Sequence, residues 1–162
     1  VTKSKKVDSE FNARYSAKEK TYIYSLYYGD ENPLKSRYKT YLKTPPDINK
    51  MKQACAVLVG THDFKCFLAS GSSVKDTVRT IFKATATKTK GGIKFTFTGN
   101  GFLYNMVRIM AGTLLYVNNG KISADSIPKI IASKDRTTAG ITAIPDGLYL
   151  NKVFFSGDEN ES

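Results

Sequence analysis

Residues 91–112 read GGIKFTFTGNGFLYNMVRIMAG, and they hold a turn, a strand and a helix in one stretch. The double glycine at the start is a turn signal between two strands. Residues 93–98 alternate strictly between apolar and polar side chains, which is typical of a strand with one buried face. Residues 101–117 carry apolar side chains at helical spacing and end before Asn118. The stretch therefore predicts a strand that leads into a long helix.

The segments on either side complete an α+β domain. β-branched and aromatic residues predict strands, and apolar residues spaced by three and four predict helices. The predicted strands are residues 20–28, 77–87, 93–98 and 147–155, and the predicted helices are residues 48–59, 101–117 and 124–133. Asp47 and Ser123 are expected to cap two helices, and residues 32–46 and 61–71 are expected loops. The order β-α-β-β-α-α-β predicts a ferredoxin-like fold, an antiparallel sheet with helices packed on one face.

The chain is strongly basic. Lysine and arginine number 25 and aspartate and glutamate 14, which gives a net charge of +11 over 162 residues. We expect a basic polar segment at residues 1–19, one α+β domain at residues 20–155 and an acidic tail at residues 156–162. The excess of positive charge favours nucleic acid as a partner over charge kept for solubility alone. Twenty of the 25 basic residues are Lys, which suits a diffuse attraction to phosphate.

Other classes of function have little support in the sequence. Four possible metal ligands lie near one another, namely Cys55, His62, Asp63 and Cys66. They form no C-x-x-C pair, and Cys55 belongs to the apolar face of a predicted helix, so we expect no metal. There is no phosphate-binding glycine motif and no apolar run of ~20 residues, so we expect no cofactor and no membrane contact. Two cysteines and the lack of a secretory signal favour a cytoplasmic location.

An RNA-recognition module has the same order of strands and is a competing interpretation. Residues 90–97, KGGIKFTF, imitate the start and end of that module's third-strand motif. Gly92 and Lys94 occupy positions where the motif needs aromatic side chains that stack on bases. The rings of Phe95 and Phe97 are therefore better explained as part of the core.

Arg108 is the only charged residue between Gly101 and Val117. A helix with so few charges is expected to be buried, and a buried guanidinium needs an anionic partner. That partner could be an acid of this chain, such as Asp63 or Asp135. Alternatively, Arg108 could position a catalytic carboxylate or a phosphate. The sequence pattern leaves both alternatives open.

Seven blocks of sequence, in order over residues 11–155, are similar to one known family. The blocks are ARYSA at residues 13–17, KTYIY at 20–24, GTHDFKCF at 60–67, VRTI at 78–81, NGFLYNMVRIMAG at 100–112, KDRTTAG at 134–140 and GLYLNKV at 147–153. With these blocks the chain resembles the C-terminal half of the TruA-type tRNA pseudouridine synthases. The resemblance implies the fold of that half and isomerisation of uridine to pseudouridine in the anticodon stem-loop of tRNA.

The resemblance also implies a homodimer, no metal and no organic cofactor. In the family, the catalytic Asp follows Gly-Arg-Thr in a loop of the N-terminal half, and this sequence contains no such loop. The sequence also starts with Val1 where a complete chain would have Met. We therefore expect part of a longer isomerase that supplies active-site walls and RNA-binding surface and is inactive alone. The alternative is a stand-alone, non-catalytic RNA-binding module with a ferredoxin-like fold.

Three residues match the family's active site. Tyr22 matches a Tyr that packs on the target base, although a core strand Tyr is the simpler interpretation. Arg108 matches the Arg that pairs with the catalytic Asp, and Leu148 matches an apolar residue that lines the uracil pocket. Four further residues match family positions more loosely and are candidates for phosphate contacts: Arg14, Lys18, Lys20 and Arg79. Each of them could equally be a solvated surface charge.

Overall fold

The structure is a computed structural model that describes residues 4, 6–13 and 15–155. Arg14 and the predicted acidic tail at 156–162 lie outside the described residues. The strands are β1 (Ala17–Tyr28), β2 (Thr40–Leu42), β3 (Gly60–Asp63), β4 (Val78–Thr89), β5 (Gly92–Gly99) and β6 (Leu148–Phe155). The α-helices are α1 (Pro33–Ser36), α2 (Ile48–Val57), α3 (Met106–Asn118) and α4 (Ile127–Ser133). Short 3₁₀ turns at Lys65–Phe67, Ala124–Ser126, Arg136–Thr138 and Pro145–Gly147 join them.

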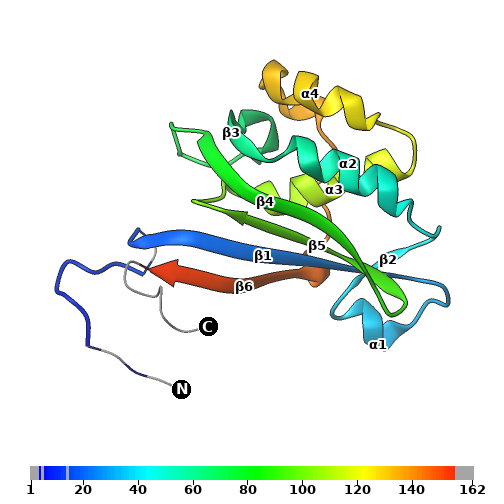
Figure 1. The fold of residues 1–162 in the computed structure, drawn as a ribbon, viewed down its shortest axis with the longest axis horizontal. Helices are drawn as coiled ribbons and strands as arrows, with labels where there is room; N and C mark the ends of the chain where they lie inside the picture. Colours follow the sequence, from blue (N-terminus) through cyan, green and yellow to red (C-terminus); the bar gives the residue numbers. More distant parts are fainter. Residues whose placement is uncertain (1–3, 5, 14, 156–162) are drawn as a thin grey trace.

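The six strands form one mixed sheet with β1 at its centre. The strand order is β2-β1-β5-β4-β3, and β6 also pairs with β1. β5 runs antiparallel along one side of β1, while β6 and β2 share the other side, β6 antiparallel and β2 parallel. Helices α2, α3 and α4 cover one face, and the short α1 lies apart from them near β2 (Figure 1). β6 and the start of β1 thus lie at an end of the sheet that the helices leave open.

The core lies between the sheet and α3. Ile93, Phe95 and Phe97 are all buried, as the alternation in this strand predicts. Because both phenylalanine rings have no exposed surface, they cannot stack on RNA bases as in an RNA-recognition module. Nine of the 13 residues of α3 are buried, which agrees with a helix whose only charge is Arg108.

The predicted α+β class and the helical layer are confirmed, and several details differ. Asp47 caps α2 as predicted, since its Oδ1 accepts hydrogen bonds from two backbone N–H groups. The Ser123 side chain caps nothing, because a 3₁₀ turn precedes α4. The parallel β2 departs from a purely antiparallel sheet. The segments predicted as loops, 32–46 and 61–71, contain α1, β2 and β3, each only three or four residues long and therefore too short to show a period.

The long helix begins five residues later than the sequence pattern predicts. Asn105 has a φ of 56°, a left-handed conformation that a right-handed helix cannot contain. Residues 101–105 therefore form an irregular segment, and α3 starts at Met106. As a result Arg108 lies in the first turn of α3.

Candidate functional site

Three residues that are far apart in the sequence line one hollow of about 120 Å³. Tyr22 comes from β1, Arg108 from the first turn of α3, and Leu148 is the first residue of β6. The antiparallel pairing of β6 with β1 brings Leu148 opposite Tyr24, two residues from Tyr22. The other lining residues are Phe102, Leu103, Asn105, Met106 and Val107.

Tyr22 and Tyr24 show the difference between a site residue and a core residue. Tyr24 is fully buried, and its hydroxyl is hydrogen-bonded to Thr40 Oγ1 and to the carbonyl oxygen of Ile144. Tyr22 is only partly buried, and its ring meets that of Phe102 edge-on, with centroids 5.1 Å apart. Burial raises the pKa of Tyr22, so its phenol stays neutral at physiological pH. The Tyr22 ring thus supplies an apolar wall to the hollow.

Arg108 is held by neutral acceptors alone. Its Nε donates to the carbonyl oxygen of Ala143 at 2.6 Å, and its Nη1 donates to Asn105 Oδ1 at 3.1 Å. Within the described part of the chain, Nη2 makes no hydrogen bond and no carboxylate pairs with Arg108. The guanidinium is half-buried at the wall of the hollow, so it keeps donor capacity for an anion there.

The two acids that could have paired with Arg108 are engaged elsewhere. Asp63 forms an ion pair with Lys134 at 2.8 Å. Asp135 accepts hydrogen bonds from the backbone N–H and the hydroxyl of Thr137, both at 2.8 Å. The interpretation of Arg108 as a structural partner of Asp63 or Asp135 is therefore wrong.

The acceptor for Arg108 Nε belongs to a segment, residues 139–143, that runs along α3 and that we call the strap. Two backbone N–H groups of the strap bond to the helix, Ala143 to the carbonyl oxygen of Arg108 and Gly140 to Thr113 Oγ1. The approach is so close that a Cβ on Gly112 would lie 1.8 Å from the carbonyl oxygen of Ile141. Only glycine at position 112 lets the strap reach α3 and hold Arg108.

A larger groove of about 750 Å³ adjoins the hollow of about 120 Å³, and four residues line both: Tyr22, Phe102, Leu103 and Asn105. Lys20 and Arg79, two of the predicted phosphate contacts, also line this groove. Lys18 is exposed on β1 and is not among the lining residues. Nη1 of Arg79 donates to the carbonyl oxygens of Asp76 and Val78 and lies 3.8 Å from the Asp76 carboxylate.

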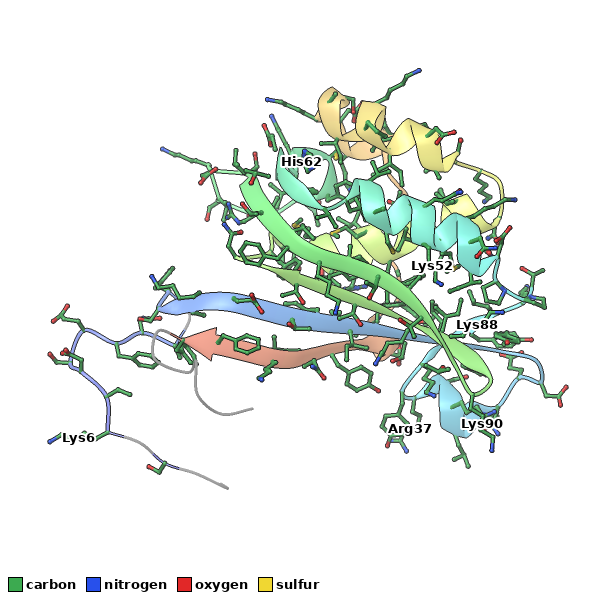
Figure 2. All side chains as sticks on the ribbon, in the orientation of Figure 1. Lys6, Arg37, Lys52, His62, Lys88 and Lys90 are labelled. Atoms are coloured by element: carbon green, nitrogen blue, oxygen red, sulfur yellow. The ribbon has the colours of Figure 1, made fainter. Side chains whose placement is uncertain are left out.

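Basic side chains are not confined to the groove. Figure 2 shows Arg37, Lys88 and Lys90 near one another at the end of the sheet beside α1, Lys52 on α2, and Lys6 at the opposite end of the molecule. None of these five side chains forms an ion pair within the described residues. The positive charge therefore creates a broad field around the molecule, as the abundance of lysine predicts.

Sequence reasoning missed the groups that orient Arg108. Asn105 was placed inside the predicted helix, yet it ends the irregular segment and accepts a hydrogen bond from Arg108. One signal was available, because Asn is a poor helix former that tolerates left-handed backbone and marks helix ends. The role of the Ala143 carbonyl had no signal, since a backbone oxygen carries no side-chain identity.

The described residues offer no metal centre and no reactive thiol. No three His, Cys, Asp or Glu side chains gather within them, and His62 lies beside Val59 and Phe64 (Figure 2). Burial raises the pKa of both Cys55 and Cys66 to about 12, so neither is a thiolate at neutral pH. No helix among these residues is long and apolar enough to cross a bilayer.

The family described as tRNA pseudouridine synthase matches residues 54–156. The tRNA pseudouridine synthase A of Thermoanaerobacter sp. (strain X514) is 47% identical over 156 residues, which are 96% of this chain and 64% of that protein. The protein of the same name from Limosilactobacillus reuteri (strain DSM 20016) is 43% identical over 164 residues, 99% of this chain and 64% of the relative. The one from Bacillus licheniformis (strain ATCC 14580) is 46% identical over 156 residues, 96% and 63% respectively.

These matches agree with the resemblance found in the sequence blocks. The α+β arrangement is that of the pseudouridine synthases. The chain belongs to the tRNA pseudouridine synthase family, and it spans about 64% of the length of the relatives it matches.

Proposed function

We propose that this chain works as part of an isomerase that converts uridine to pseudouridine in the anticodon stem-loop of tRNA. The observation that carries the proposal is the hollow of about 120 Å³ where Tyr22, Arg108 and Leu148 come together from three separate elements. As part of this proposal we call it the uridine hollow. The reaction breaks the bond between N1 of uracil and C1′ of the ribose and forms a bond from C5 to C1′. A proton leaves C5 and N1 ends protonated, so atoms balance without metal or cofactor.

The proposal gives each residue of the hollow a task. A base turned out of its stack needs new apolar contacts, and Tyr22 and Leu148 supply them. Arg108 binds the catalytic carboxylate, keeps it ionised and orients it toward the ribose. That carboxylate is the Asp of a Gly-Arg-Thr-Asp loop, which the present sequence does not contain. The chain supplies the walls of the site, and the loop supplies the reacting group.

The proposed partner is tRNA, bound in a cytoplasmic homodimer. Support comes from the net charge of +11 and from Lys20 and Arg79 in the larger groove, which we call the RNA groove as part of this proposal. Lys18, which is exposed on β1, is proposed as a further phosphate contact, and so is Arg14, which lies outside the described residues. Because most of the basic side chains are lysines, the affinity for tRNA is expected to depend little on the RNA sequence and strongly on the salt concentration.

Tritium release from tRNA labelled at C5 of uridine tests the proposed reaction. The 162-residue chain alone is expected to release no tritium, whereas the gene product that carries the Gly-Arg-Thr-Asp loop is expected to turn over. Turnover by the chain alone would contradict the assignment of the Asp. No turnover by either protein would favour the non-catalytic RNA-binding module instead.

A titration of tRNA binding against salt tests the RNA-binding part. The affinity of the chain is expected to fall steeply between about 50 and 200 mM salt, by about tenfold or more, because phosphate contacts release counterions. The measurement is fluorescence anisotropy of labelled tRNA. An affinity that stays flat over this range would show that phosphates do not dominate the interface.

A further inference from the structure

An exposed tyrosine stands in the RNA groove directly before the residues that orient Arg108. Tyr104 lines the groove and is 57% exposed. Its backbone is fixed on both sides, because its carbonyl oxygen accepts a hydrogen bond from Ala69 N–H and the next residue, Asn105, holds Arg108. The ring is thus presented to solvent from a fixed position, next to the uridine hollow but outside its lining.

The described residues give this ring no structural task. Within them no aromatic ring or cation pairs with Tyr104, and its hydroxyl makes no hydrogen bond. Tyr149 is exposed but engaged, since its hydroxyl donates to the backbone carbonyl oxygen of Tyr38. The side chain of Tyr38 is as exposed as that of Tyr104 and has no such partner within the described residues either, but it lies outside the groove. A large aromatic ring that is carried by a held backbone and has no partner within the described residues is suited to stacking on a base in this polar groove.

The cation needed for the adjoining phosphate lies in the same groove. The stem of Arg79 lies against Gly101, since a Cβ there would be 3.5 Å from Arg79 Cδ and Nε. Arg79 is held by carbonyl oxygens and by the carboxylate of Asp76, which is 77% exposed. An ion pair with so exposed a carboxylate is weak, so a phosphate can compete with Asp76 for the guanidinium.

From these observations we infer that the RNA groove is a subsite for the nucleotide adjacent to the target uridine, with its base stacked on Tyr104 and its phosphate on Arg79. The inference rests on the proposed function, which puts the target base in the uridine hollow. Four residues line both spaces, so one RNA strand can pass from one to the other without a gap. The ligand is an unpaired nucleotide, because a base in a duplex has no free face for an aromatic ring.

The composition of the chain provides a clean probe. It contains no Trp, so Tyr104→Trp introduces a single indole whose emission reports stacking at this one position. Tyr38→Trp is the matched control, because Tyr38 is 58% exposed and lies between α1 and β2, outside the groove. Two RNA hairpins serve as ligands, one with an all-uridine loop and one with an abasic loop that keeps the same phosphates.

The all-uridine hairpin is expected to quench the indole emission of the Tyr104→Trp variant and leave that of the control variant unchanged. The abasic hairpin is expected to bind without quenching. By anisotropy, Tyr104→Ala should bind the all-uridine hairpin about tenfold more weakly, and Tyr104→Phe, which keeps the ring, as tightly as the unchanged chain. Melting curves check that each variant is folded.

The outcomes separate the subsite from the proposed function. If the all-uridine hairpin binds while the indole emission stays constant and Tyr104→Ala binds normally, the stacking subsite is overturned and the RNA-binding role stands. If neither hairpin binds in low salt, the RNA-binding role itself fails and the subsite falls with it. Equal quenching by the abasic hairpin would mean that the indole responds to phosphate, which also overturns base stacking.

Discussion

Two cations on the helical side of the sheet differ in what holds them. Lys134, directly after α4, pairs with the carboxylate of Asp63 at 2.8 Å. Arg108, at the start of α3, has only the carbonyl oxygen of Ala143 and the amide oxygen of Asn105 as acceptors within the described residues. The first cation finds its anion inside the chain, whereas the second is oriented by neutral groups beside a hollow. A cation that is paired with a carboxylate of its own chain, such as Lys134, is thus a structural charge. A cation that is held only by neutral acceptors, such as Arg108, is a candidate for binding an anion.

The strap connects these two regions. Arg136 donates from Nη1 to the carbonyl oxygen of Gly140 at 2.8 Å and from Nη2 to Thr142 Oγ1 at 3.1 Å. Both of its Nη groups are thus used within the strap, while Arg108 keeps one Nη without a hydrogen bond in the described part of the chain. The comparison predicts that a change at Lys134 leaves turnover nearly unchanged, whereas a change at Arg108 lowers turnover strongly.

The largest effect is expected from Arg108→Ala in the gene product that carries the Gly-Arg-Thr-Asp loop. An oriented carboxylate that loses its arginine is destabilised by about 3 kcal/mol, so turnover should fall about a hundredfold or more. In the present chain the same change removes two hydrogen bonds and should lower the free energy of unfolding by about 1–2 kcal/mol. Tritium release and urea melts measure the two quantities.

Lys134→Ala is the matched control for this experiment. It also removes one cation, but one that is more than half exposed and paired within the chain. Turnover is expected to stay within about twofold of the unchanged enzyme. If Lys134→Ala slowed turnover as much as Arg108→Ala, the general loss of positive charge would explain both results, and the distinction between the two cations would fail.

The next largest effect is expected where the strap packs against Gly112 of α3. Gly112→Ala would place a Cβ 1.8 Å from the carbonyl oxygen of Ile141, so the strap must move and the unfolding free energy should fall by about 3 kcal/mol. Gly101→Ala is the control, since the nearest atom to its Cβ is 3.5 Å away, an ordinary contact. Chemical denaturation of the two variants should show a large loss for the first and a small one for the second; equal losses would mean that the strap yields easily.

Arg136→Ala should have a smaller effect on the same strap. It removes two charge-assisted hydrogen bonds that are partly buried, which predicts a loss of about 2 kcal/mol in the unfolding free energy. Arg136→Lys should recover only part of this loss, because one ammonium group cannot reproduce the spacing of two guanidinium nitrogens. Full recovery by lysine would indicate that charge alone holds the strap.

The sequence predicted the fold well where periodic patterns are long. The alternation of Ile93, Phe95 and Phe97 predicted a half-buried strand, and the lack of charges around Arg108 predicted a buried helix. Elements of three or four residues were missed, since a helix or strand that short leaves no repeat to detect. The start of α3 was misplaced because helical spacing continued into residues whose backbone Asn105 does not allow to be helical.

The sequence pattern marked Arg108 as a candidate, but grouping it with Tyr22 and Leu148 required the family resemblance. The three residues lie in separate blocks that share no local pattern. The pairing of β1 with β6 brings Leu148 near Tyr22, and the first turn of α3 adds Arg108. The choice between Asp63, Asp135 and an absent anion for Arg108 needed the structure, because ion pairs depend on distances that spacing along the chain does not define. The hydrogen bond from Arg108 to the Ala143 carbonyl oxygen also could not be predicted from the sequence. It depends on how closely the strap packs against α3.

The smallest expected effect is a pH dependence of the stability difference between Lys134→Ala and the unchanged chain. The hydrogen bond from Lys134 lowers the pKa of Asp63, and the Thr77 hydroxyl adds to this. A carboxyl whose folded pKa is lowered stabilises the fold above its unfolded pKa of about 3.9, and this contribution is lost as the pH falls through the folded value. Lys134→Ala should therefore lose less than about 1 kcal/mol at neutral pH, and its difference from the unchanged chain should shrink below about pH 4.

Arg108 provides the contrast in the same measurement. Since no carboxylate within the described residues pairs with it, the stability lost in Arg108→Ala should be the same at neutral pH and below about pH 4. Urea melts of the three proteins across this range, at constant ionic strength, measure both differences. If the loss in Arg108→Ala also shrinks in acid, a carboxylate of this chain holds Arg108 in solution. Arg108 would then be a structural cation like Lys134, and the proposed pairing with a catalytic Asp would have to be given up.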